Sequence, residues 1–143
     1  MRRYAFLLII MCCLTLVGCS EKPISPTELP QEVQTFVKQN FANKTITFAQ
    51  KDPGLFGSEY DITLNDGTAI SFDTNKEWDK VSSPTEPIPA AIVPATIASH
   101  INTSFPNVMI RKIEKDDDGY EVELANNMEL KYNKQGALME MDD

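Results

Sequence analysis

The sequence predicts an α+β fold: a single antiparallel β-sheet with helices packed on one face, built from two tandem repeats of one helix and three or four strands. Two observations predict it. The segment that begins at Leu29 matches the segment that begins at Val93, as expected for an internal repeat. Within each segment, apolar residues at helical spacing precede short runs of alternating apolar and polar residues, which are typical of strands with one buried face.

The repeat covers most of the chain. Residues 29–52 align with residues 93–116 at an offset of 64 without a gap, and after four residues drop out the match continues at an offset of 60. The shared positions are mostly apolar, so they indicate a shared fold rather than shared chemistry. The main pairs are Val37 and Ile101, Phe41 and Phe105, Ile46 and Ile110, Tyr60 and Tyr120, Leu64 and Leu124, Ile70 and Leu130, Phe72 and Tyr132, and Val81 and Met141.

A helix is expected at the start of each repeat. Pro30 and Pro94 suit a first helical turn, where the missing N–H of proline is not needed. The apolar residues that follow recur at helical spacing and form one stripe per helix. These residues are Val33, Phe36, Val37 and Phe41 in the first repeat, and Ile97, Ile101 and Phe105 in the second.

Antiparallel strands are expected after each helix. Residues 60–64 and 120–124 alternate between apolar and acidic or polar side chains. Asn65-Asp66-Gly67 is a strong hairpin turn, because these residue types tolerate positive φ. Further strands are predicted near 70–72 and 130–132, near 44–51 and 108–115, and near 77–81 and 137–141.

The two repeats are expected to form one domain. A unit of about fifty residues is marginal alone because it buries too little surface, whereas two units that share a sheet and a helix layer solve this problem. The predicted domain therefore covers residues 29–143, with repeat one at 29–82, a proline-rich connector at 83–92 and repeat two at 93–143.

The first residues predict export. Arg2 and Arg3 precede an apolar run at 4–17, which is too short to span about 30 Å of hydrocarbon and is typical of a secretory signal peptide. The run ends in Leu16-Val17-Gly18-Cys19, which resembles a bacterial lipobox. The resemblance implies that residues 1–18 are removed and that Cys19 carries lipid, so the protein is anchored to a membrane. The alternative is a plain cleaved signal with Cys19 incidental.

This processing predicts a location in the bacterial cell envelope. Ser20 after the cysteine is compatible with the outer membrane, facing the periplasm or the cell surface, and residues 20–28 are expected to be an extended tether. Cys12 and Cys13 would leave with the signal, so the folded part has no cysteine for a disulfide or a thiolate metal site.

The charge of the chain disfavours nucleic acid as a partner. The 143 residues hold 13 Lys and Arg against 21 Asp and Glu, a net charge of −8, whereas phosphate binding needs clustered basic residues. Loss of Arg2 and Arg3 with the signal leaves 11 basic residues against 21 acidic ones, a net charge of −10.

The tandem pattern resembles the PepSY-like, or β-lactamase-inhibitor-like, family of small envelope lipoproteins. The matching features are a Leu-Pro or Val-Pro helix start, an aromatic residue that ends the helix, a Tyr-x-Ile/Val-x-Leu strand, a turn, and a strand with Phe or Tyr before Asp or Asn. Here they are Leu29-Pro30, Phe41, residues 60–64, 66–67 and 70–73, with counterparts Val93-Pro94, Phe105, residues 120–124, 126–127 and 130–133. The resemblance implies a single antiparallel sheet with helices on one face, and a class of domains linked to restraining secreted peptidases.

No residues predict catalysis, a metal or a cofactor. His100, the only histidine, aligns with Phe36 on the inner face of the helix and is expected to be half-buried and hydrogen-bonded. Asp116-Asp117-Asp118-Gly119 fails the EF-hand spacing, because the glycine comes too soon. It is expected to be a solvated turn, and the alternative is weak, adventitious calcium binding.

Two groups are candidates for partner contact. Five acidic side chains, Glu59, Asp61, Glu121, Glu123 and Glu129, should line the open sheet face, where an acidic surface could dock a basic partner. Leu55 and Phe56 lie in a stretch that repeat two lacks, and they are candidate contact anchors together with Trp78. The favoured alternative is that Leu55 and Phe56 fold back under the sheet edge and that Trp78 caps the core, since large apolar residues are usually buried.

The sequence thus predicts a lipid-anchored envelope protein with a non-catalytic domain that binds or restrains another protein or peptide. The alternative is a structural component, or one that senses a small ligand between the helices and the sheet.

Overall fold

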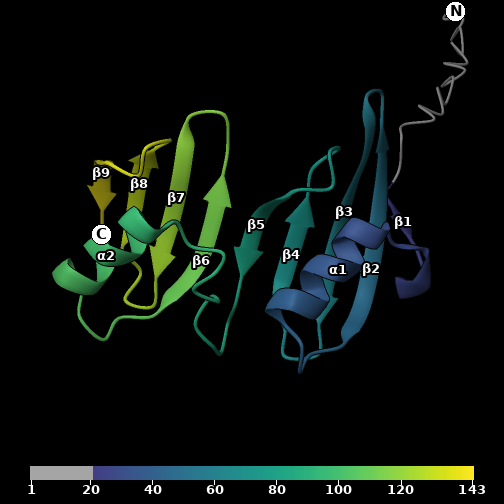
Figure 1. Ribbon diagram of the computed structural model, residues 1–143, viewed down its shortest axis with the longest axis horizontal. Coiled ribbons are helices and arrows are strands. Elements are labelled where there is room, and N and C mark those ends of the chain that lie inside the picture. Colours follow the sequence, from purple (N-terminus) through teal and green to yellow (C-terminus); the bar gives the residue numbers. More distant parts are fainter. Residues whose placement is uncertain (1–20) are drawn as a thin grey trace, which may run out of the picture.

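The computed structural model describes residues 21–143, and within them it contains one antiparallel sheet of nine strands and two α-helices (Figure 1). The strands follow one another across the sheet in chain order. The predicted signal peptide and Cys19 lie outside the described residues. The first half has β1 (Lys22–Pro23), α1 (Gln31–Asn40), β2 (Ile46–Gly54), β3 (Gly57–Leu64), β4 (Ala69–Phe72) and β5 (Trp78–Ser82); the second has α2 (Ala95–Ser104), β6 (Ile110–Lys115), β7 (Gly119–Leu124), β8 (Glu129–Asn133) and β9 (Leu138–Asp142).

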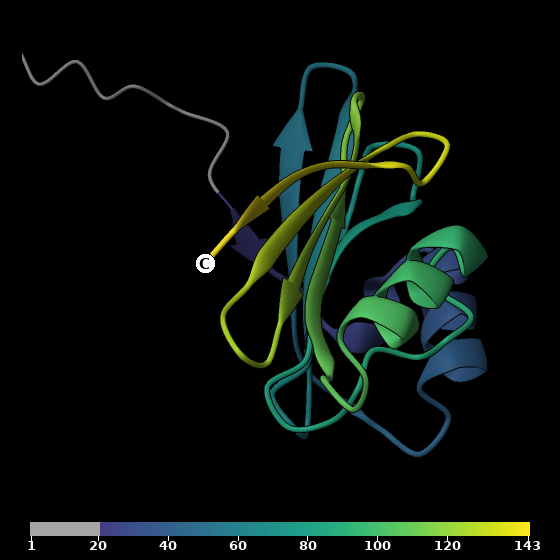
Figure 2. The same cartoon turned by 90° about the vertical axis from the view of Figure 1, so that its left-hand side faces the viewer.

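Both helices cover the same face of the sheet and leave the other face open (Figure 2). Pro30 and Pro94 are N-cap residues, so each helix begins one residue later than the proline suggested. The stripe residues Val33, Val37, Ile97 and Ile101 are buried against the sheet. The predicted fold class is therefore confirmed, including the helices on one face.

The two repeats place equivalent residues at equivalent points. Tyr60 pairs with Lys51 and Phe72, and Tyr120 pairs with Lys115 and Tyr132, as an offset of 60 or 64 requires. The last strand pair of each repeat contains a β-bulge. It lies opposite Ser71 and Phe72 in the β4–β5 pair and opposite Lys131 and Tyr132 in the β8–β9 pair.

The repeats meet where β5 pairs with β6, so they form one continuous sheet. Val81 lies opposite Ile113, and neither side chain is exposed to solvent. The connector is packed rather than loose, since the N–H of Ser83 donates to the carbonyl of Arg111 at 2.8 Å and Ile88 is buried. Ser83 and Thr68 are also buried.

The predicted extended tether at 20–28 is wrong from Lys22 onward. Lys22 and Pro23 form β1 against β2, and the N–H of Ile24 donates to the carbonyl of Ala49 at 3.0 Å. A 3₁₀ turn at Pro26–Glu28 follows, in which the Glu28 carboxylate accepts a hydrogen bond from the N–H of Ser25 at 2.7 Å. An extended, proline-containing segment satisfies the geometry of an edge strand as well as that of a linker, so composition alone did not separate the two.

Candidate functional site

The tip of the β2–β3 hairpin presents two large apolar side chains to solvent. Leu55 is 95% exposed and Phe56 is 93% exposed. The favoured sequence interpretation, in which both residues fold back under the sheet edge, is therefore wrong. A hairpin tip extends beyond the helix layer and offers nothing for these side chains to pack against. Figure 1 shows the hairpin reaching past the other strands at the same end of the sheet.

Glycines and strand pairing hold the tip in place. Gly54 and Gly57 are register partners on either side of the two-residue turn. Gly57 has φ of +138°, a conformation that favours glycine, and a Cβ there would crowd the Thr74 side chain at 3.2 Å. The strands are paired up to the tip, so Leu55 and Phe56 are carried on a rigid support rather than on a loose loop.

Trp78 does not join the hairpin tip. It lies in β5 opposite Phe72, so β4 separates it from the hairpin strand β3. The indole is partly buried against the core, as the alternative interpretation expected, and Lys115 Nζ lies 4.9 Å from the ring centroid. Trp78 also lines an open hollow beside α1, with Phe36 and Gln39.

The open sheet face carries the five predicted acidic residues, but lysines are interleaved with some of them. Lys112 Nζ lies 3.2 Å from Glu121 and 3.3 Å from Glu114. Glu123 lies directly opposite Glu129, a like-charge pair that weakens the strand contact. The half of the face formed by repeat two is therefore mixed in charge rather than uniformly acidic.

Asp79 is the acidic residue that sequence reasoning missed. The β-bulge between β4 and β5 turns it toward the open face, where it lines a hollow with Glu59 and Asp61. Its Oδ1 atom is buried without a hydrogen-bond partner. Burial raises the pKa of the Asp79 carboxyl, and the nearby charges of Asp73, Glu59 and Asp61 raise this pKa further. A simple two-residue alternation could not show this orientation, because a bulge shifts the alternation by one residue.

His100 has the structural role expected for it. Its Nδ1 atom lies 2.8 Å from the Tyr132 hydroxyl, and the ring is partly buried. Burial raises the pKa of Tyr132 to about 12. The pair joins α2 to β8, so the contact holds the helix on the sheet.

The aspartates of the turns are used by the turns themselves. Asp116 Oδ1 accepts hydrogen bonds from the N–H groups of Asp118 and Gly119 at 2.8 and 2.9 Å, and Asp73 Oδ1 accepts from Asn75 and Glu77 at 2.8 and 3.0 Å. Within residues 21–143 no group of three or more His, Cys, Asp or Glu side chains has the geometry of a metal site.

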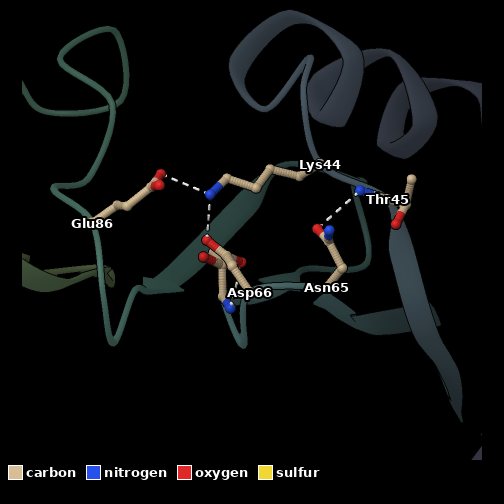
Figure 3. A network of polar contacts seen from close by, with 6 residues as sticks. Lys44, Thr45, Asn65, Asp66 and Glu86 are labelled. Carbon is tan, nitrogen blue, oxygen red and sulfur yellow. Dashed lines mark hydrogen bonds and ion pairs between the residues drawn. The ribbon is translucent and has the colours of Figure 1, made fainter.

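A partly buried ion-pair network lies at the end of the first repeat opposite the hairpin tip (Figure 3). Lys44 Nζ lies 2.7 Å from Asp66 and 2.7 Å from Glu86 of the connector, and the side chains of Lys44 and Asp66 are only 17% and 16% exposed. Desolvation alone would raise the pKa of Asp66, but hydrogen bonds from Lys44 and Thr68 outweigh it and lower this pKa to about 2. Asn65 accepts a further bond from the N–H of Thr45 at 3.2 Å. The network fastens the connector to the β3–β4 turn, and its three charged residues line a small hollow of about 180 Å³.

Neither helix of the described part of the chain is long and apolar enough to cross a membrane. A family model described as "beta-lactamase-inhibitor-like, PepSY-like" matches residues 15–54 and 58–140. The chain belongs to the PepSY-like family. The resemblance seen in the tandem motifs is thereby confirmed.

The PepSY-like fold is also present in solved structures from Bacteroides. A "putative calcium-regulated periplasmic protein" of Bacteroides thetaiotaomicron is 32% identical, with a TM-score of 0.81 over 86% of this chain and 97% of that one. A periplasmic protein of the DUF2874 family from Bacteroides vulgatus is also 32% identical, with a TM-score of 0.81 over 87% and 98%. These periplasmic relatives agree with an envelope location.

A third structure, from Bacteroides vulgatus, is 21% identical with a TM-score of 0.81 over 87% of this chain and 100% of that one, and supports the fold alone. No curated protein matches the chain. The family match is interrupted at residues 55–57, so the exposed tip of the hairpin falls outside the shared PepSY-like pattern.

Proposed function

We propose that this protein is a lipid-anchored envelope protein whose PepSY-like domain is non-catalytic and binds or restrains another protein through the β2–β3 hairpin tip. The observation that carries the proposal is the exposure of Leu55 and Phe56 at more than nine-tenths of their surface. They stand side by side on a rigid hairpin, at the point where the family pattern is interrupted.

The energetics of the tip favour a protein partner. Moving one fully exposed Leu or Phe side chain into an apolar pocket contributes about 1.5–3 kcal/mol. Two adjacent side chains on a preorganised support therefore contribute several kcal/mol before the costs of association. Within the domain they contact little, so their energetic value lies in a contact with another molecule.

The charge near the hairpin favours a pocket with a basic rim. Glu59 is in β3, two residues beyond Gly57, and Asp61 and Asp79 lie in the same hollow. A pocket that takes Leu55 and Phe56 and is bordered by Lys or Arg would gain both apolar contact and a faster encounter with this acidic domain.

Lipid on Cys19 would hold the domain close to its membrane. Lys22 of β1 is three residues beyond Cys19, and three extended residues reach about 10 Å. A partner must therefore lie within one domain length of the bilayer. Cys19→Ala should move the protein into the soluble fraction, and retention of the variant in the membrane would contradict the anchor.

Photo-crosslinking tests the contact at the tip. Phe56 is replaced by benzoylphenylalanine in envelopes of the native bacterium, and Phe48, a half-exposed residue on the open face, is the matched control. We expect one discrete adduct from position 56 and none from position 48. Leu55→Ser should greatly reduce the adduct while leaving the melting temperature unchanged. Equal labelling from both positions would contradict a contact at the tip.

A second candidate function is the binding of a small ligand. An apolar groove of about 350 Å³ lies between α2 and the connector, within the usual size of ligand sites. Its lining includes Ile88, Ala98, Ile101 and Val108. Ala98→Trp should fill the groove and remove any ligand that native mass spectrometry detects, without changing the adduct at position 56.

Calcium regulation is described for the Bacteroides thetaiotaomicron relative. The crosslinking experiment therefore includes samples with calcium and with a chelator. If calcium changes the yield of the adduct, the domain of this chain shares that regulation; if it does not, the proposed contact acts without it.

A further inference from the structure

The two edges of the sheet differ in whether another strand can add to them. At one edge, β1 covers β2 with two residues, Lys22 and Pro23, and such short, lysine- and proline-containing strands protect an edge from pairing. At the other edge, β9 has five residues without Lys or Pro, and all five are exposed. Within residues 21–143 only β8 pairs with β9.

The internal repeat shows what the β9 edge is shaped to accept. β9 corresponds to β5 at an offset of 60, and β5 is covered by β6. Val81 faces Ile113 across this junction and is 0% exposed, whereas its counterpart Met141 is 51% exposed because no strand of the described chain lies beyond it. Residues 21–143 thus contain both a filled and an empty copy of the same strand edge.

The strand pairing shows which residue of β9 directs its backbone N–H and C=O groups away from β8. The N–H of Ser83 donates to Arg111 of the β6 segment, and since bonding directions alternate along a strand, Val81 also directs its backbone groups toward β6. By the same alternation, Met141 directs its N–H and C=O toward the free side of β9.

The charges specify the chemistry of the missing strand. In the filled junction Lys80 Nζ lies 3.4 Å from Glu114 across the strands. The counterpart of Lys80 is Glu140, which already pairs with Lys131 of β8 at 3.0 Å. Glu114 likewise takes two lysines, Lys80 and Lys112, so a Lys or Arg at the same position beside β9 would be a second cation on Glu140. Asp142 adds further negative charge to this edge, and Leu138 and Met141 offer exposed apolar surface.

A second copy of the chain fits this edge poorly. Antiparallel pairing of two β9 strands about Met141 would place Glu140 opposite Asp142 twice, and like charges directly opposite destabilise a sheet. Head-to-tail pairing would need the edge of β2, where Lys22 and Pro23 of β1 already pair with Lys51 and Gln50 in the middle of the strand.

We propose that β9 binds an extended segment of another protein that alternates apolar and basic residues, and that this segment adds a tenth strand to the sheet. This inference rests on the proposed function, since it takes a polypeptide as the partner, but it uses a different surface from the hairpin tip. Main-chain hydrogen bonds supply affinity in this type of recognition, and alternate side chains supply specificity.

The test uses peptides copied from β6. The lysine probe is a fluorescent synthetic peptide of residues 109–115 that carries Glu114→Lys, and the glutamate probe is the same peptide with Glu114 kept. We expect the lysine probe to bind wild-type protein severalfold more tightly than the glutamate probe. Glu140→Lys in the protein should reverse this preference, because it recreates the Lys80–Glu114 pair. A preference that Glu140→Lys leaves unchanged would overturn the proposal.

A matched pair of variants at position 141 tests the backbone contact. Met141→Pro removes the outward N–H, a change that edge strands tolerate, and should weaken peptide binding at least tenfold. Met141→Val keeps the N–H and copies Val81, so it should bind within about twofold of wild type. Equal binding by the proline variant, or no shift of the β9 amide signals with 1 mM peptide, would overturn the proposal.

Two outcomes separate this inference from the proposed function. Leu55→Ser should leave peptide binding unchanged, and Met141→Pro should leave the adduct at position 56 unchanged. A dimer in sedimentation experiments that Met141→Pro dissociates would overturn the peptide proposal in favour of self-association.

Discussion

The two repeats of this PepSY-like domain have the same core but different polar and exposed residues. In the first repeat α1 rests on the sheet through Phe36 and Phe72, whose ring centroids are 5.4 Å apart; in the second, α2 uses His100 and Tyr132, 5.7 Å apart. The extra residue of the β-bulge is Asp79 in the first repeat and the exposed Met139 in the second.

The ends of the repeats differ more than their cores. The first repeat has the long hairpin that carries Leu55 and Phe56, whereas the second turns at Asp116–Asp118. The Lys44–Asp66–Glu86 network belongs to the first repeat, because Val108 and Asn126 replace Lys44 and Asp66 in the second. The repeats thus share the residues that pack the sheet against the helices, and the proposed contact at Leu55 and Phe56 lies where the repeats differ.

The largest expected effect is at the junction of the repeats. Ile113→Ala should lower the free energy of unfolding by about 2–5 kcal/mol, because it opens a cavity at the strand pair that joins them. Hydrogen exchange should show that the amides of both repeats lose protection together. If β7 and β8 alone lost protection while β3 and β4 kept theirs, the repeats would be independent domains. Phe48→Ala, at a half-exposed side chain, is the control.

The Phe–Phe pair of the first repeat should be able to replace the His–Tyr pair of the second. Tyr132→Phe leaves His100 Nδ1 without its partner and should cost about 1 kcal/mol in thermal unfolding. The double variant His100→Phe/Tyr132→Phe copies the Phe36–Phe72 pair and should recover most of that loss. A double variant no more stable than the single one would show that the two helix contacts are not interchangeable.

The network of the first repeat should give stability that depends on pH. The pKa of Asp66 falls from 3.8 to about 2 in the folded state, so its stabilisation is present above pH 3.8 and is lost as the pH falls toward 2. Asp66→Asn should cost about 1 kcal/mol at pH 7, less than the full linkage value because solvent still reaches the ion pair.

This cost should disappear near pH 2, as urea unfolding at several pH values would show. Asn126→Asp is the matched control in the second repeat and should bring no gain, since Val108 stands where Lys44 would be needed. A constant cost of Asp66→Asn from pH 7 to pH 2 would contradict the ion pair.

The smallest expected effect concerns Asp79. Because burial raises its pKa, the protonated form is favoured in the folded state, and stability is lost as the pH rises through that pKa. Asp79→Asn should therefore raise the melting temperature slightly at pH 7 and leave it unchanged below about pH 4. A lower melting temperature of Asp79→Asn at pH 7 would mean that the ionised carboxylate binds a partner in solution. A rise in the melting temperature of the wild type on addition of calcium would then identify this partner as a cation.

The core of this fold could be predicted because it depends on period and repetition. Two patterns predict a buried face directly: the helical stripe that contains Val33 and Val37, and the strand alternation around Ile62. All three side chains are buried. The offset of 64 then 60 predicts equivalent points for Tyr60 and Tyr120, and the strand pairing confirms them.

The site depended on exceptions to those patterns. Asp79 faces the open side because of a bulge, and Leu55 and Phe56 are exposed because a tight turn carries them beyond the helices. Residue type alone favoured burial for both apolar residues, and the strand pairing up to Gly54 and Gly57 overrode that preference. The pairing of β1 with β2 could not be predicted for a similar reason, because a strand of two residues is too short to show an alternation.

A hairpin exchange tests the central claim that the tip of the first repeat makes the contact. Residues 52–59 are replaced by Asp116–Gly119 of the second repeat, and the partner captured at position 56 is purified and titrated against both proteins. Because the second repeat already folds with that short turn, the exchanged protein should melt within a few degrees of wild type and bind the partner at least a hundredfold more weakly. Undiminished binding by a folded, exchanged protein would contradict the account.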